Sequence, residues 1–342
     1  MFPALLLQGE EATLDRPDRG LADIAVDRGQ PIRLLGHEGQ HRLQVLEVEE
    51  EQALVIGELD GRYILASETC ALDIIGARFV RDVENGEVVV ISEAGIESLR
   101  FAPAQPQRPC VFEYIYFARP DSVVNGRSVY TARKAFGAEL AREAPAEADV
   151  IVPVPDSGVP AAIGFSQACG VPYELGIIRN HYVGRTFIQP TQSVRELGVR
   201  LKHSANRAVV EGKRIVLVDD SLVRGTTSVK IVRMMREAGA REVHFRIASP
   251  PITHPDFYGI DTPEKEKLLA ATHDLEGMRA YIGADSLAFL SVEGLYRGLG
   301  CERRNPARPQ FTDHCFTGDY PTALTDLTVA TPRKLALLAE AD

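Results

Sequence analysis

The 342-residue sequence lacks several features that define specialised classes of protein. It has no tryptophan, and no apolar run approaches the roughly 20 residues that a membrane-spanning helix needs. Its 38 lysines and arginines are outnumbered by 48 aspartates and glutamates, which gives a net charge of −10. An acidic chain is poorly suited to neutralising nucleic-acid phosphates, although it can still hold a local basic pocket. We therefore expect neither a membrane partner nor a nucleic-acid partner.

Cysteine is also scarce and shows no pairing pattern. The chain has five cysteines, an odd number, and no Cys-x-x-Cys pair. This favours reduced thiols over a disulfide framework. The first residues, MFPALLLQGEEATLD, contain a short apolar run without a preceding basic segment, which does not fit a secretory signal peptide. We expect a cytoplasmic protein.

The length predicts about two domains. Residues 1–52 are rich in charged residues and have weak periodicity. Residues 53–100 contain short apolar runs separated by Asp-Gly at 60–61 and Asn-Gly at 85–86. Both dipeptides are hairpin signals between apolar runs, so a small antiparallel β segment is expected there. Three prolines within residues 101–109 then indicate a linker.

After the linker, apolar strand patterns alternate with helical ones. Strands are expected near residues 111–117, 148–155, 173–178, 213–220, 241–249 and 284–292. Helices are expected over about 128–142, 159–170 and 226–239. Continuous apolar strands that alternate with helices predict an α/β fold with a parallel sheet covered on both faces.

The string VLVDDSLVRGTTS, residues 216–228, carries the clearest chemical signal. An apolar strand ends in Asp219 and Asp220, and a hydroxyl-rich loop with Gly225 leads into a helix. Open parallel sheets bind ligands at the carboxyl ends of their strands, where loop amides and a helix N-terminus can hold a phosphate. The two carboxylates suit a sugar diol, a divalent cation or both. Together these features predict a phosphorylated ribose as the ligand.

An isolated Asp-Asp or Gly-Thr-Thr would be explained more simply as part of a capped turn, but the whole string would not. It resembles the phosphoribosyl pyrophosphate (PRPP) signature of type I phosphoribosyltransferases, and it is neither a Walker A loop nor a Rossmann glycine motif. The resemblance implies that Asp219 and Asp220 bind the ribose hydroxyls directly or through Mg²⁺. The residues assigned to the 5′-phosphate loop are Ser221, Arg224, Gly225, Thr226 and Thr227.

A second strand–turn–helix pattern lies at residues 152–162. Its turn contains Asp156, Ser157 and Gly158. Backbone amides in such a turn can hold a pyrophosphate, and Ser157 can reach a metal ion. Alone this turn carries no functional meaning. In the same sheet as the first motif it becomes the expected second anion site, so the expected metal ligands are Ser157, Asp219 and Asp220.

A basic stretch over residues 179–207 lies between the two loops in the sequence. Alone it would be interpreted as a solvated surface loop. Between two anion sites it predicts a lid that neutralises the pyrophosphate and excludes water from the activated sugar. Arg185 and Lys202 are the candidate catalytic residues of this lid.

The resemblance is more specific than the fold, because four separated blocks resemble amidophosphoribosyltransferases. It covers about residues 53–330, and the blocks are residues 66–92, 110–122, 182–188 and 248–263. This family joins an N-terminal glutaminase domain, with an N-terminal cysteine nucleophile, to a phosphoribosyltransferase domain. Ammonia released from glutamine displaces pyrophosphate from PRPP in purine biosynthesis. The resemblance therefore implies a glycosyltransferase that uses Mg²⁺ and forms homo-oligomers, with purine nucleotides as candidate inhibitors.

The sequence departs from this family at its beginning. Its first cysteine is Cys70, and residues 1–52 do not resemble a glutaminase. We expect an N-terminally truncated or diverged member, with residues 53–105 as a β remnant of the glutaminase and residues 106–342 as the phosphoribosyltransferase domain. Such a chain is expected to use ammonia and not glutamine, because amide hydrolysis needs a nucleophile and an oxyanion hole.

A second departure concerns iron. Some family members hold a [4Fe–4S] cluster on four cysteines. Cys110 stands at one of these positions and Asp256 at the second, while Pro309 and Thr312 occupy the remaining segment with only Cys315 nearby. We therefore expect no iron–sulfur cluster.

Three other interpretations stay open. A PRPP-binding transcription regulator can share this fold, although the acidic charge and the lack of a helix-turn-helix pattern disfavour it. A salvage transferase acting on a purine or pyrimidine base is disfavoured by the family-specific blocks. An inactive remnant that exposes the surface normally covered by a glutaminase is the third.

Overall fold

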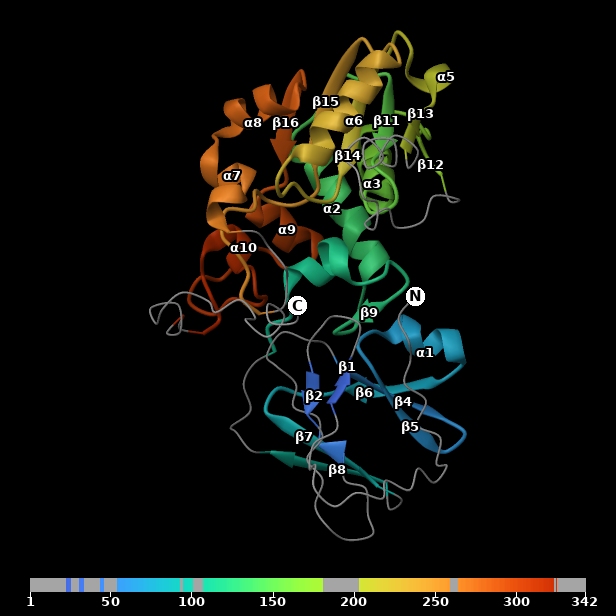
Figure 1. Ribbon diagram of the computed structural model, residues 1–342, viewed down its shortest axis with the longest axis vertical. Helices are drawn as coiled ribbons and strands as arrows, with labels where there is room; N and C mark the ends of the chain where they lie inside the picture. Colours follow the sequence, from blue (N-terminus) through green and yellow to red (C-terminus); the bar gives the residue numbers. More distant parts are fainter. Residues whose placement is uncertain are drawn as a thin grey trace, which may run out of the picture.

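The structure is a computed structural model that describes residues 54–92, 95–100, 107–180, 203–258, 264–322 and 324. Before residue 54 it describes three short strands, β1 (Asp23–Ala25), β2 (Pro31–Arg33) and β3 (Gln44–Val45). Figure 1 shows two parts arranged along the long axis. We call residues 54–100 the β unit and residues 107–322 the α/β domain.

Two antiparallel sheets and one helix form the β unit. Its elements are β4 (Val55–Leu59), β5 (Arg62–Ala66), α1 (Thr69–Ile75), β6 (Arg78–Asp82), β7 (Glu87–Ser92) and β8 (Gly95–Arg100). One sheet has the order β5-β4-β6, and the other has the order β3-β7-β8. The expected antiparallel β segment is therefore confirmed.

The two hairpin signals in this unit have different outcomes. Asp60 and Gly61, with φ of 51° and 75°, form the two-residue turn between β4 and β5, as expected. The Asn-Gly at 85–86 instead joins β6 to β7, which belong to different sheets, so the hairpin expected there is wrong. The sequence analysis also missed α1, which ends at Gly76 in the left-handed conformation.

The α/β domain is built on a four-stranded parallel sheet with the order β11-β14-β15-β16. The strands of this sheet are β11 (Val150–Pro153), β14 (Arg214–Asp219), β15 (Glu242–Ile247) and β16 (Ser286–Phe289). Its longer helices are α2 (Val129–Glu143), α3 (Val159–Cys169), α6 (Thr226–Glu237), α8 (Leu275–Ile282) and α9 (Val292–Gly298). Its shorter elements are β9 (Val123–Val124), β10 (Arg127–Ser128), α5 (Arg207–Val210), η2 (Lys265–Lys267), α7 (Leu269–Thr272) and α10 (His314–Thr317).

Both faces of the sheet are covered by helices (Figure 1). Val216 and Val218 of β14 face the core formed with α2, α3 and α9. Their neighbours Ile215 and Leu217 face the core formed with α6 and α8. Because successive strand residues point to opposite faces, a strand buried on both sides must be apolar throughout. This is why the sequence predicted β14 correctly.

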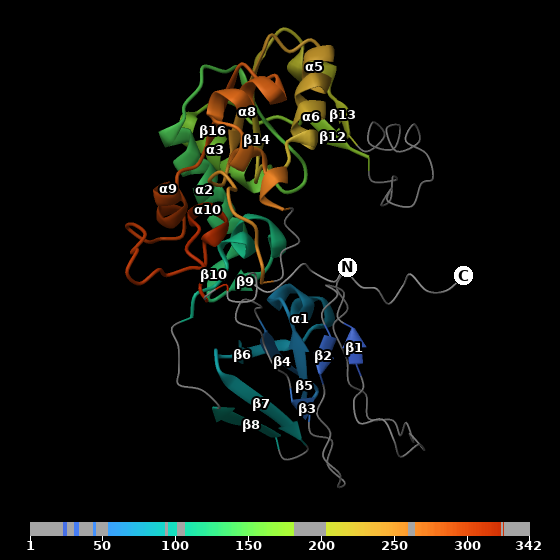
Figure 2. The ribbon, with the colours of Figure 1, turned by 60° about the vertical axis from the view of Figure 1, so that its left-hand side comes forward.

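Most expected elements are found, but residues 111–117 are not a strand. Residues Glu113–Phe117 form a π-helix (η1) with Tyr114 and Ile115 buried. Aromatic and β-branched residues favour strands only weakly, and packing against α2 overrides that preference. The strand expected at 173–178 is instead β12 (Ile177–Arg179), which pairs with β13 (His203–Ala205) in a ribbon beside α6 (Figure 2).

Helices α2 and α3 approach each other unusually closely. A Cβ atom on Gly137 would lie 1.8 Å from the carbonyl oxygen of Ala161, and one on Gly164 would lie 1.9 Å from that of Lys134. The two glycines therefore allow direct backbone contact between the helices. This contact fixes α3, whose N-terminus carries the turn at residues 155–158, against the rest of the domain.

The β unit meets the α/β domain at a buried carboxylate. Glu68 is 4% exposed, and its Oε2 accepts hydrogen bonds from the Arg119 amide at 2.7 Å and the Ser122 hydroxyl at 2.9 Å. The Val123 amide donates to the Thr69 hydroxyl at 2.8 Å. Figure 2 shows α1 at this junction. A carboxylate buried among several donors gives the junction a defined geometry.

None of the helices in the described part of the chain combines the length and apolarity that a membrane crossing requires.

We expect Glu87→Gln to destabilise the β unit at neutral pH and to make it less sensitive to acid. Burial raises the pKa of Glu87, but hydrogen bonds from Arg81, the Glu84 amide and Ser98 outweigh burial and lower the pKa to about 2. Since this folded-state pKa lies below the unfolded value, the wild type loses stability as the pH falls from about 5 towards 2. Thermal unfolding across this pH range measures both effects.

The exposed Glu97 on β8 provides the matched control, Glu97→Gln, which should leave both quantities unchanged. An equal acid sensitivity of wild type and Glu87→Gln would contradict this account of Glu87.

Candidate functional site

The two loops singled out in the sequence lie next to each other at one edge of the sheet. Strands β11 and β14 are parallel neighbours, so both end at the same edge. The Val154 amide, just beyond β11, donates to the Val218 carbonyl at 2.8 Å. One loop, residues 155–158, follows β11, and the other, residues 219–225, follows β14. This is the edge at which open parallel sheets bind ligands.

The first loop is packed tightly against the end of β14. A Cβ atom on Gly158 would lie 2.5 Å from the Val218 carbonyl oxygen and 2.8 Å from that of Val154. Only glycine fits there without moving the backbone. The same Cβ atom would lie 3.2 Å from the Cα atom of Asp219 in the second loop, and the Ser157 side chain lowers the pKa of Asp220. The expected pyrophosphate loop and the expected ribose carboxylates are thus in direct contact.

The second loop ends at a glycine that starts a helix. Gly225 has φ of 73° and precedes α6, which has no side-chain cap hydrogen bond. A Cβ atom there would lie 2.8 Å from Leu269 Cδ2, so the loop depends on glycine both for conformation and for space. Thr226 and Thr227 are exposed at the first turn of the helix. Uncapped amides and exposed hydroxyls at a helix N-terminus suit an anion such as a phosphate.

Two adjacent carboxylates are buried at the end of β14. Asp219 is 9% exposed and Asp220 6%. The Asp220 amide donates to Asp219 Oδ1 at 3.0 Å, and the Ser221 hydroxyl donates to Asp220 Oδ1 at 2.5 Å. These hydrogen bonds fix the orientation of both carboxyl groups.

Burial of this pair disfavours its charge. Desolvation raises the pKa of Asp219 well above its ordinary value, and repulsion from Asp220 raises it further. Desolvation also raises the pKa of Asp220, while hydrogen bonds from Ser157 and Ser221 and the charge of Arg133 act in the opposite direction. A cation or hydroxyl donors would stabilise the ionised forms of two carboxyl groups that burial has removed from water.

The donor set at this edge fits Mg²⁺. It offers carboxylate oxygens of Asp219 and Asp220 together with the hydroxyl of Ser157, and Mg²⁺ prefers hard oxygen ligands supplied by a few carboxylates and by substrate phosphates. No soft ligand that would favour another metal takes part in the contacts described for these three residues.

The remaining residues expected at the site differ in their exposure, and two of them are not described by the structure. Arg224 is exposed on the second loop, and Ser221 is half-buried. Asp156 is exposed and forms an ion pair with Arg179 at the end of β12. The Pro155–Asp156 peptide bond is cis. Arg185 and Lys202, the two lid candidates, lie outside the described residues.

The sequence analysis missed Arg133, whose charge lowers the pKa of Asp220. It occupies the apolar face of α2, between Ala132 and Phe136, and is 3% exposed. A charged residue within the apolar stripe of a helix was the available signal.

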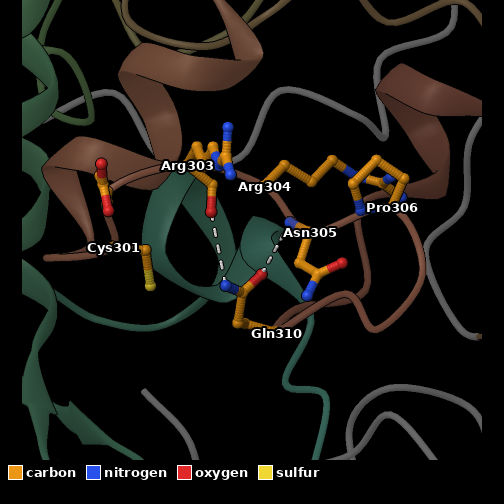
Figure 3. A pocket seen from close by; sticks show the side chains of 7 residues that line it. Cys301, Arg303, Arg304, Asn305, Pro306 and Gln310 are labelled. Atoms are coloured by element: carbon orange, nitrogen blue, oxygen red, sulfur yellow. Dashed lines mark hydrogen bonds between the residues drawn. The ribbon is translucent and has the colours of Figure 1, made fainter.

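A separate pocket of about 720 Å³ is formed by residues 301–310. Figure 3 shows its lining, in which the Gln310 side chain accepts a hydrogen bond from the Asn305 amide at 3.3 Å and donates one to the Arg303 carbonyl at 3.4 Å. None of the residues expected to bind PRPP lines it. It is not part of the candidate site.

The positions considered for an iron–sulfur cluster lie elsewhere and are packed with other contacts. Cys110 and Thr312 are paired in an isolated β-bridge. His314 Nε2 lies 2.7 Å from Asp256 Oδ2, and the Tyr258 amide donates to Asp256 Oδ1 at 2.9 Å.

Among the described residues, Asp256, His314 and Cys315 offer ligand atoms within 4.8 Å of one another. This mixed set does not fit the four thiolates that such a cluster requires. The absence of a cluster stays a prediction.

We expect Asp219→Asn to raise the stability of the ligand-free protein. The substitution removes a buried charge but keeps an oxygen that accepts from the Asp220 amide. Because burial raises the pKa of Asp219 in the folded state, the wild type loses stability as the pH rises towards neutrality, and the variant should not. A gain of about 1 kcal/mol corresponds to roughly 2 °C in Tm.

Asp73→Asn, at an exposed carboxylate of α1, is the control and should leave Tm unchanged. A decrease in Tm for Asp219→Asn at neutral pH would show that the charge is not destabilising.

Comparison with known proteins agrees with this geometry. A family model described as the phosphoribosyl transferase domain matches residues 121–248. An amidophosphoribosyltransferase of Rhizobium etli is 66% identical over 293 residues, which are 84% of this chain and 59% of that protein. An amidophosphoribosyltransferase of Bacillus subtilis is 54% identical over 287 residues, which are 84% of this chain and 60% of that protein. The chain spans about three fifths of the length of these curated relatives.

Two solved structures are also similar. One is a glutamine PRPP amidotransferase from Bacillus subtilis complexed with ADP and GMP, with a TM-score of 0.77 and 52% identity over 86% of this chain and 64% of that chain. The other is described as the allosteric regulatory enzyme of purine biosynthesis, with a TM-score of 0.78 and 51% identity over 88% of this chain and 64% of that chain. The expected fold class is confirmed.

Proposed function

Because this chain is homologous to the amidophosphoribosyltransferases over 84% of its length, we propose that it binds PRPP with Mg²⁺ and forms 5-phosphoribosylamine, with ammonia as the nucleophile. The observation that carries the proposal is the contact between the two anion loops. A Cβ atom on Gly158 would lie only 3.2 Å from the Cα atom of Asp219. The turn expected to bind pyrophosphate is therefore next to the buried acidic pair.

The proposed reaction is a displacement at C1 of the ribose. The bond between C1 and the pyrophosphate oxygen breaks, and its electron pair leaves with the pyrophosphate. The nitrogen of ammonia forms the new bond to C1 and then loses a proton to solvent. Positive charge develops on the sugar ring as the leaving group departs, so binding and charge stabilisation can supply most of the catalysis.

Each part of the site has a proposed task. The amides and hydroxyls of residues 221–227 bind the 5′-phosphate. Asp219 and Asp220 bind the ribose hydroxyls, and their negative charge favours the cationic sugar as it develops. The turn at residues 156–158 binds the pyrophosphate end through its amides. Mg²⁺, held by Ser157, Asp219 and Asp220, would neutralise charge on the leaving pyrophosphate.

Two further residues are proposed for the lid. Arg185 and Lys202 would approach the pyrophosphate when the basic segment closes, as their charge suggests. Closure would exclude water, which competes with ammonia for the activated sugar.

The β unit contains no proposed catalytic group. We propose a domain division near residue 105, with residues 53–105 as the part related to the glutaminase of the longer relatives. We also propose that the protein is a cytoplasmic homo-oligomer. The Bacillus subtilis structure that contains ADP and GMP supports purine nucleotides as candidate inhibitors of this chain.

The test is PRPP- and Mg²⁺-dependent release of pyrophosphate by the purified chain, with ammonium chloride and then with glutamine. We expect release with ammonium and not with glutamine. The double variant Asp219→Asn/Asp220→Asn should lower the rate about a hundredfold or more, because it removes the carboxylates that face the ribose.

Other outcomes separate the alternatives. Activity with glutamine would contradict the proposal that ammonia is the nucleophile used by this chain. Turnover only with a purine or pyrimidine base would indicate a salvage transferase. PRPP binding without turnover would favour a regulator or an inactive remnant, and salt-dependent DNA binding would then identify the regulator.

A further inference from the structure

Three side chains that can bind a metal ion are buried together outside the candidate site. They are Asp256, His314 and Cys315, which are 7%, 1% and 2% exposed, and their ligand atoms lie within 4.8 Å of one another. His314 and Cys315 begin the short helix α10, while Asp256 belongs to the segment that follows β15. Polar groups of this kind are seldom buried together unless they bind one another or a common ligand.

The surrounding contacts orient the carboxylate and the imidazole of this cluster. Asp256 Oδ1 accepts a hydrogen bond from the Tyr258 amide at 2.9 Å, and Asp256 Oδ2 lies 2.7 Å from His314 Nε2. The imidazole is stacked on the ring of Tyr320, with centroids 4.8 Å apart, and its edge contacts Tyr258, with centroids 5.3 Å apart. Outer contacts of this kind fix the orientation of the ligands in metal sites.

Backbone hydrogen bonds join the two segments that supply the cluster. The Cys315 carbonyl accepts from the amides of Thr253 at 2.9 Å and His254 at 3.1 Å. The Tyr320 hydroxyl donates to the Pro255 carbonyl at 2.8 Å. The backbone that carries the three side chains is therefore already held together, so a bound ion would need little rearrangement of the chain.

The chemistry of the donors selects Zn²⁺. Proteins bind Zn²⁺ through carboxylate oxygen, imidazole nitrogen and thiolate sulfur, whereas Mg²⁺ and Ca²⁺ prefer oxygen ligands. A carboxylate and a thiolate beside a neutral imidazole carry two negative charges, which the ion neutralises, and a neutral complex is suited to burial. Ligand atoms around a tetrahedral Zn²⁺ are roughly 3.3 to 3.6 Å apart, so shifts of roughly 1 Å would bring all three onto one ion.

We propose that Asp256, His314 and Cys315 form a binding site for a single Zn²⁺ ion, with a water molecule as the fourth ligand. The ion would replace the proton between His314 Nε2 and Asp256 and the proton of the Cys315 thiol, and both protons pass to solvent. It would join the segment after β15 to α10 and so stabilise the folded domain.

This site is distinct from an iron–sulfur cluster and from the PRPP site. Within the part of the chain that the structure describes, the group of ligand atoms includes His314 and does not include Cys110. None of its members is a residue expected to bind PRPP. Zn²⁺ binding requires neither PRPP nor turnover, so the inference and the proposed function can fail separately.

The first test is a titration of the metal-free full chain with Co²⁺, followed by absorption spectroscopy. Co²⁺ adopts the same coordination as Zn²⁺, and a thiolate ligand gives it a charge-transfer band that a carboxylate site cannot produce. We expect one equivalent of Co²⁺ to produce the band, Zn²⁺ to abolish it, and a large excess of Mg²⁺ to leave it unchanged. A wild-type chain that shows no such band would overturn the inference.

The second test uses matched variants. Cys315→Ser should abolish the band, whereas Cys169→Ser, at an exposed thiol of α3, should retain it. Asp256→Asn and His314→Gln keep polar side chains of similar size and should weaken Zn²⁺ binding about a hundredfold or more, as measured by competition with a chromogenic chelator. A band that survives Cys315→Ser, or Zn²⁺ affinities equal to that of the wild type, would overturn the inference.

Thermal unfolding completes the experiment. Tm without metal establishes that each variant folds, and Cys315→Ala replaces Cys315→Ser if the serine variant does not. Added Zn²⁺ should raise the Tm of the wild type and of Cys169→Ser but not that of the Cys315 variant, because only a folded site gains stability from the ion. The double variant Asp219→Asn/Asp220→Asn should behave like the wild type. An equal rise in Tm with and without Cys315 would place the ion elsewhere and contradict the proposal.

Discussion

The burial of two adjacent carboxylates at the end of β14 is the constraint on which the site depends. Asp219 and Asp220 are shielded from water by the end of the sheet and by the loop that follows β11. Desolvation opposes the ionisation of both carboxyl groups, and repulsion from Asp220 adds to this at Asp219. This unfavourable free energy of ionisation arises at a position where a bound sugar diol and a cation would offset it. Such a stability cost is typical of a binding site rather than of a structural core.

The surrounding fold makes this arrangement possible through close backbone contacts. Gly158 allows the first loop to lie against β14, and Gly225 allows the second loop to turn into α6. Gly137 and Gly164 bring α2 and α3 together, so that α3 presents its N-terminus at the same edge. The loops are therefore rigidly placed by helix and sheet packing, and pre-organised loops bind an anion with little ordering cost.

Arg133 and Glu68 connect this site to the rest of the chain. Glu68 accepts from the Arg119 amide, and the adjoining Ala118 carbonyl accepts from Arg133. The charge of Arg133 also lowers the pKa of Asp220. The segment of residues 113–123 is thus bonded on one side to the β unit and on the other side to α2.

The sequence predicted those parts of the fold whose local pattern agrees with their environment. Strand β14 is buried on both faces and reads as a continuous apolar run, and Gly170 ends α3 in the left-handed conformation. The structure of residues 111–117 could not be predicted from the sequence, because their aromatic and β-branched side chains are typical of a strand. Tertiary contacts with α2 stabilise a π-helix there instead. The site loops were found from their motifs, whereas Arg133 and Glu68 act through contacts between segments far apart in the sequence.

The most direct test of the central claim is a crystal structure of the chain with PRPP and Mg²⁺. The account predicts the 5′-phosphate on the amides of residues 221–227, the ribose hydroxyls at Asp219 and Asp220, and the pyrophosphate at residues 156–158. PRPP bound elsewhere, for example in the pocket formed by residues 301–310, with the acidic pair empty, would contradict it.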